Sequence, residues 1–80
     1  LQVDTDPDTA RTLYDVACGL DPLSDELARR AMRASARLGD AARVRDRLTA
    51  LRRELDEAGI DIDPDTEELA TDLLRELANP

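Results

Sequence analysis

The sequence predicts an all-α fold of about four helices, arranged as antiparallel helical hairpins in a single domain over residues 1–80. Three observations lead to this prediction. Alanine, leucine, arginine and glutamate are abundant, and they favour helix on intrinsic propensity. Apolar residues recur at steps of three and four, the period of a helix with one buried face. Most of the glycines and prolines stand at the ends of these periodic segments, where helices begin and end.

The first helix is expected over about residues 9–20, where the apolar positions predict one buried stripe. The stripe consists of Ala10, Leu13, Tyr14, Val16, Ala17 and Leu20. Gly19 and Pro22 then end the helix, because glycine tolerates left-handed backbone and proline cannot continue the hydrogen-bond ladder.

The second and third helices are expected to form an antiparallel hairpin over residues 24–58. Ser24 is a good N-cap for the second helix. The inner face of that helix is Leu27, Ala28, Ala31, Met32, Ser35 and Leu38. The third helix, residues 41–58, repeats Val44, Leu48, Leu51 and Leu55 and ends at Gly59. A turn as short as Gly39–Asp40 requires neighbouring helices to run antiparallel.

The segment "IDIDPDT" predicts a short extended connector followed by a fourth helix, about residues 64–78. We expect Ile60 and Ile62 both to pack against the hairpin. The inner face of the fourth helix is Leu69, Leu73, Leu74 and Leu77.

The pattern D-x-D-P-D-T occurs twice, at residues 4–9 and 61–66. Three alternating carboxylates are also the opening of a calcium loop, but such a loop requires glycine at its sixth position and glutamate at its twelfth. This chain has Thr9 and Thr66 at the sixth position, and a proline inside each copy. We therefore interpret Asp6 and Asp63 as N-caps of helices, and predict no metal site.

Arginines on the second helix are the candidate partner-binding residues. Arg29, Arg33 and Arg37 are spaced by four and share one stripe, which suits bidentate binding of carboxylates or phosphates. The alternative is a solvated face, because Asp25 precedes Arg29 by four residues and Glu26 precedes Arg30 by four, the order that favours pairs within a helix.

The charge distribution excludes some classes of function. The net charge is −8, and it divides into −6 over residues 1–28, +7 over 29–53 and −9 over 54–80. Acidic flanks repel phosphates, so we expect no direct nucleic-acid binding by this chain.

The sequence has no histidine, no lysine and one cysteine, Cys18, which we interpret as a buried small apolar residue. We predict no enzyme activity, no catalytic residue, no cofactor, no membrane contact and a cytoplasmic location.

A shift of 34 residues superimposes the first helix on the third. The aligned pairs are Asp6 with Asp40, Ala10 with Val44, Tyr14 with Leu48, and Ala17 with Leu51. This is the period of the tetratricopeptide repeat. It divides the chain into the end of one repeat (1–22), a helical hairpin (23–59), and a connector with a capping helix (60–80). The chain would then be the C-terminal fragment of a larger domain.

The order of features from "LDPLSDELARRAMRASARLGD" to "LRRELDEAGIDIDPDTEEL" resembles the bacterial transcriptional activator domain, a tetratricopeptide-like module of actinobacterial regulators. The resemblance covers about residues 10–77, and Leu48 stands where that family often has an aromatic residue. It implies a non-catalytic module for protein contacts or self-association.

The expected partner is a protein with an acidic surface, or a second copy of this chain. We expect a homodimer in which Tyr14, Val16 or Leu20 are buried against the other copy. The alternative is a structural terminal domain of an unrelated multidomain protein, a membrane-anchored one included.

Overall fold

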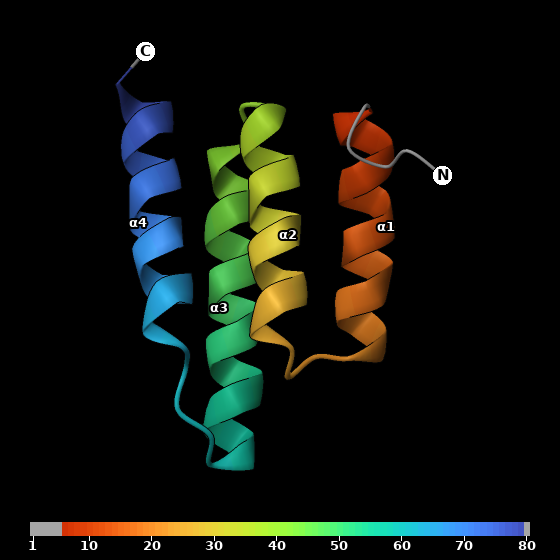
Figure 1. Ribbon diagram of the computed structural model, residues 1–80, viewed down its shortest axis with the longest axis vertical. Coiled ribbons are helices and arrows are strands. Elements are labelled where there is room, and N and C mark those ends of the chain that lie inside the picture. Colours follow the sequence, from red (N-terminus) through yellow and green to blue (C-terminus); the bar gives the residue numbers. More distant parts are fainter. Residues whose placement is uncertain (1–5, 80) are drawn as a thin grey trace.

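The computed structural model describes residues 6–79, which form four helices and no strand. The helices are α1 (Pro7–Leu20), α2 (Asp25–Arg37), α3 (Ala41–Ala58) and α4 (Pro64–Ala78). Each runs antiparallel to the one before it in the chain, and α1 and α4 lie at opposite edges with α2 and α3 between them (Figure 1). The predicted all-α fold of about four helices is confirmed.

The helix ends follow the local signals in the sequence. The side chains of Asp6, Ser24, Asp40 and Asp63 each accept a hydrogen bond from a backbone N–H in the first turn of the following helix. These bonds satisfy donors that a helix cannot pair internally. Gly59 ends α3 in the left-handed conformation, with φ at 70°, and Ile60 N–H donates to the Leu55 carbonyl at 2.9 Å.

The two apolar clusters lie among α2, α3 and α4, and Ala10 and Cys18 of α1 are also buried. One cluster consists of Met32, Val44, Leu48 and Ala70, and partly buried leucines of α4 pack against it. A second consists of Ala28, Leu51 and Leu55. α2 packs against all three other helices, and its buried side chains are mostly small: Ala28, Ala31, Ala34 and Ser35, with Met32. Small side chains let neighbouring helices approach on several sides at once.

The connector buries only one of its two isoleucines. Ile62 packs against both clusters, whereas Ile60 is 48% exposed, so the expectation for Ile60 is wrong. The reason is that Ile60 belongs to the turn that ends α3, and the backbone of this turn directs its side chain toward solvent. Leu38 was expected on the inner face of α2, but it is 40% exposed because α2 ends at Arg37.

The first helix buries only part of the stripe that its periodicity predicted, in which Tyr14 and Ala17 are half-buried. Ala10 and Cys18 are buried, whereas Leu13, Val16 and Leu20 are 40%, 58% and 83% exposed. α1 has apolar residues on two sides, and it packs mainly on one neighbour, α2. One side is therefore left uncovered among the residues that the structure describes.

Candidate interaction surfaces

The arginines of the predicted stripe do not act together, because Arg29 contacts α4 whereas Arg33 and Arg37 line a hollow beside α1. Arg29 turns toward α4, where its Nη1 donates to Thr66 Oγ1 at 2.9 Å and lies 3.3 Å from Asp63 Oδ2. Its side chain is 22% exposed. Arg29 therefore holds the start of α4 against α2, and it is not presented to a partner.

Thr66 and Asp25 complete this junction. Thr66 is fully buried, and its hydroxyl donates to Asp25 Oδ1 at 2.6 Å. The same carboxylate oxygen accepts from the Asp63 N–H at 3.3 Å. The sequence suggested an intrahelical pair of Asp25 with Arg29, but Asp25 bonds across to α4 instead. The other suggested pair exists, with Arg30 Nη2 at 3.0 Å from Glu26 Oε1.

The rest of the arginine stripe lines an open hollow of about 260 Å³ between α1 and α2. Its lining residues are Tyr14, Arg30, Arg33 and Arg37, which we call the basic hollow. A hydrogen bond from Arg30 to the Tyr14 hydroxyl, and then the bond to Glu26, raise the pKa of Arg30. Tyr14 was expected on the self-association face, but it turns toward α2 and contributes to this hollow.

The far side of α1 carries Leu13, Val16 and Leu20, which we call the outer stripe. At 100° per residue these three side chains fall within about 60° around the helix, opposite the buried Cys18. The charged residues of α1 are Asp8, Arg11 and Asp15, and each lies at least about 80° from the nearest stripe residue. The outer stripe is therefore an uncharged apolar surface.

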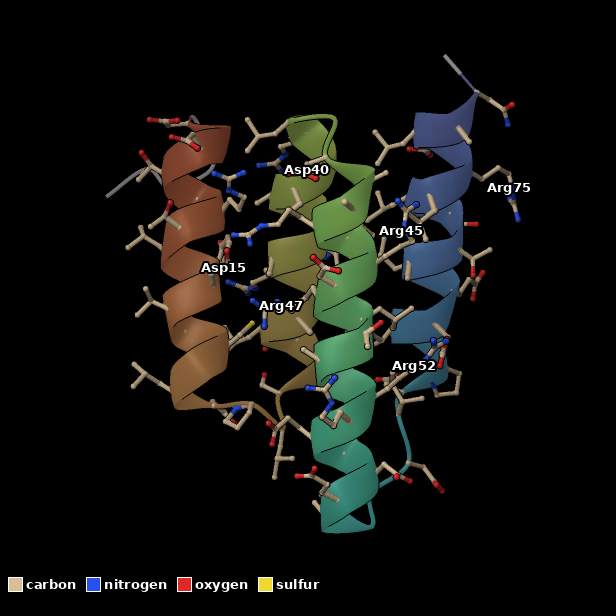
Figure 2. The ribbon with its side chains drawn as sticks, turned by 180° about the vertical axis from the view of Figure 1, so that it is seen from behind. Asp15, Asp40, Arg45, Arg47, Arg52 and Arg75 are labelled. Carbon is tan, nitrogen blue, oxygen red and sulfur yellow. The ribbon has the colours of Figure 1, made fainter. Side chains whose placement is uncertain are left out.

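Ion pairs join α1 to α3. Asp15 projects from α1 toward α3, and Arg47 projects back toward it (Figure 2). Asp15 Oδ1 lies 2.7 Å from Arg47 Nη2, and Asp15 Oδ2 lies 2.7 Å from Arg43 Nη2. Arg11 adds a longer contact, 3.7 Å, to Asp40. The buried Nε atoms of Arg11 and Arg47 have no hydrogen-bond partner in the described part of the chain. The sequence analysis missed this cluster, for which the only signal was the spacing of Arg43 and Arg47 by four.

The D-P-D-T segments act at helix ends. Asp6 accepts from the Asp8 and Thr9 N–H groups, and its other oxygen accepts from the Thr9 hydroxyl at 2.7 Å. The hydroxyl bond, followed by the backbone bond from Thr9, lowers the pKa of Asp6. Asp63 accepts from the Asp65 N–H at 2.9 Å. Asp4 lies outside the described residues, and residues 6–79 contain no group of His, Cys, Asp and Glu arranged to hold a metal ion.

Cys18 is buried, as expected, and burial raises the pKa of its thiol. A thiol of this kind is a poor nucleophile at neutral pH.

The chain matches no protein-family model, no curated protein and no solved structure. Within residues 6–79, no helix is long and apolar enough to cross a membrane.

Proposed function

We propose that this chain is a non-catalytic helical module that acts through protein contacts, and that it self-associates through α1. The proposal takes its regulatory context from the resemblance to the bacterial transcriptional activator domain of actinobacterial regulators. A cytoplasmic location belongs to the same proposal.

The observation that carries the proposal is the outer stripe. Leu20 is 83% exposed and Val16 is 58% exposed, in a chain of which 38% of the residues are charged. Thr9 precedes Leu13 by four residues, and Leu13, Val16 and Leu20 follow at steps of three and four. This spacing lets two helices interlock along a seam. A contiguous apolar surface of this kind marks an interaction site.

A second copy of the chain suits this surface because of where the charges lie. Residues 54–80, with a net charge of −9, include α4, which is at the edge of the molecule farthest from α1 (Figure 1). Pairing through α1 keeps the two acidic edges apart. Next to the outer stripe, Asp15 is compensated by its two arginines. Like-charge repulsion between the two α4 edges is therefore low, and the repulsion that remains comes from residues 1–28, with a net charge of −6.

Sedimentation velocity over about a hundredfold range of concentration tests the proposal, because a dimer dissociates on dilution. We expect the 80-residue chain to shift from monomer to dimer, and Val16→Glu to remain a monomer. Ile60→Glu is the matched control, since Ile60 is 48% exposed but lies away from α1, and we expect it to dimerise normally. A wild-type monomer at every concentration, or equal loss of the dimer in both variants, contradicts the proposal.

A further inference from the structure

The basic hollow presents donors from two helices to one small volume. Tyr14 comes from α1, and Arg30, Arg33 and Arg37 come from α2. Guanidinium groups donate hydrogen bonds and accept none, and a phenol donates one. Among residues 6–79, no acidic side chain lines this hollow. Its chemistry therefore suits a ligand made of acceptors with negative charge.

Arg33 is the group in the hollow that its own chain leaves without a counter-ion. Among residues 6–79 its guanidinium forms no hydrogen bond and no ion pair, whereas Arg29, one turn earlier, bonds Asp63 and Thr66 at the start of α4 through its Nη1. Arg30 is held at the rim by Glu26, and Tyr14 lines the hollow beside it. Arg37 has an interaction of its own, so Arg33 is the arginine of the hollow that is available to a ligand, with Arg30 and Tyr14 beside it.

We propose that the basic hollow binds a short acidic segment of a partner protein, with a side-chain carboxylate paired to Arg33. Arginine pairs with a carboxylate through two parallel hydrogen bonds, and the Tyr14 hydroxyl is placed to donate a third. The volume, about 260 Å³, accommodates side chains rather than a large ligand. This site goes beyond the proposed self-association, because the hollow and the outer stripe face different directions and have no residue in common.

Polynucleotides are less suitable ligands, although they carry the same sign of charge. Arg33 also borders a neighbouring hollow whose lining includes Asp65, Glu68 and Asp72 of α4. A phosphate chain that runs beyond the basic hollow meets these carboxylates, and each additional phosphate adds to its repulsion by a chain with a net charge of −8. A short peptide needs to cover only the basic hollow.

Fluorescence anisotropy with a labelled diglutamate peptide, at about 50 mM salt so that screening is weak, tests this site on the 80-residue chain. We expect Arg33→Glu to weaken binding by at least about tenfold, the loss typical of one charge-assisted contact. Arg45→Glu makes the same change of charge at an exposed arginine of α3, which also has no ion pair within residues 6–79, and we expect it to stay within about twofold of wild type. Circular dichroism of both variants verifies that the helices are retained.

Amide chemical shifts locate the bound peptide. We expect the largest changes at Tyr14, Arg30, Arg33 and Arg37, and a smaller loss of affinity in Tyr14→Phe. Equal losses in Arg33→Glu and Arg45→Glu, shifts centred elsewhere, or an undetectable complex overturn the proposal. Tighter binding of a single-stranded oligonucleotide of equal charge overturns the assignment to an acidic protein segment. A failure here leaves the dimer of Val16 and Leu20 unaffected, because its variants and its measurement are separate.

Discussion

At the residue scale, Thr66 shows how a single buried hydroxyl joins two helices. It donates to Asp25 of α2 and accepts from Arg29 of the same helix, although it belongs to α4. The threonine hydroxyl is the residue's only polar side-chain group, and both of its roles, donor and acceptor, are used here. A buried polar group with all its partners present specifies one arrangement of its neighbours.

Replacing Thr66 with valine preserves the shape and removes both hydrogen bonds. Asp25 and Arg29 then lose a partner at a partly buried site, so we expect a loss of about 1–3 kcal/mol in the free energy of unfolding. Urea denaturation measures it. Thr71→Val is the matched control on the same helix, because the Thr71 hydroxyl bonds only the Glu67 carbonyl at an exposed position. We expect it to change stability by less than about 0.5 kcal/mol, and similar losses in the two variants contradict the role given to Thr66.

At the element scale, α1 is attached differently from the other helices. The contacts of α3 with α2 and α4 are built from Val44, Leu48, Leu51 and Leu55. The contact of α1 with α3 depends on Asp15 and its arginines. Ion pairs that are partly exposed contribute less than apolar burial, and salt screens them. α1 itself packs mainly on α2. Its contact with α3 is therefore the part of the fold that we expect to respond most to ionic strength.

Asp15→Asn tests this attachment. The substitution removes the charge that holds Arg43 and Arg47, and we expect unfolding stability to fall by about 1–2 kcal/mol at low salt. The difference in stability between the variant and the wild type should shrink as salt is added, because salt screens the wild-type ion pairs and leaves less for the substitution to remove. Glu57→Gln also neutralises an acidic side chain, at an exposed position of α3 away from this cluster, and is expected to have little effect. A loss of stability in Asp15→Asn that does not vary with salt would show that packing, and not charge, attaches α1 to α3.

At the scale of the whole molecule, the core is off-centre. Both apolar clusters lie among α2, α3 and α4, and the molecule measures 35 × 31 × 17 Å, with α1 at one edge. Stability within a protein follows the local density of buried apolar contacts. We infer two levels of stability, a lower one for α1 and a higher one for the hairpin with α4.

Native-state hydrogen exchange measures these levels. We expect the slowest amides near Leu48 and Leu51, and faster exchange along α1, with a lower free energy of opening. Dimerisation through the outer stripe should slow exchange in α1 and leave α3 unchanged, so the measurement is made at low and at high protein concentration. One opening free energy for all four helices would contradict an off-centre core.

The positions and ends of the helices were determined by the sequence alone. Capping by Asp6, Ser24 and Asp63 and termination at Gly59 depend on neighbours within a few residues, so local chemistry was enough to predict them. The leucine repeat of α3 predicted its buried face for the same reason. The 34-residue shift also placed Ala10 and Val44 correctly, since both are fully buried.

The partners of charged and apolar side chains were decided only by the tertiary structure. Asp25 had Arg29 one turn away, yet it bonds Thr66, which is 41 residues distant in the chain. Arg33 was equivalent to Arg29 in sequence, and only the position of α4 separates their roles. Leu13 and Val16 fit a buried stripe as well as an exposed one. Periodicity shows that a helix has an apolar side, but which side is covered depends on where distant segments pack.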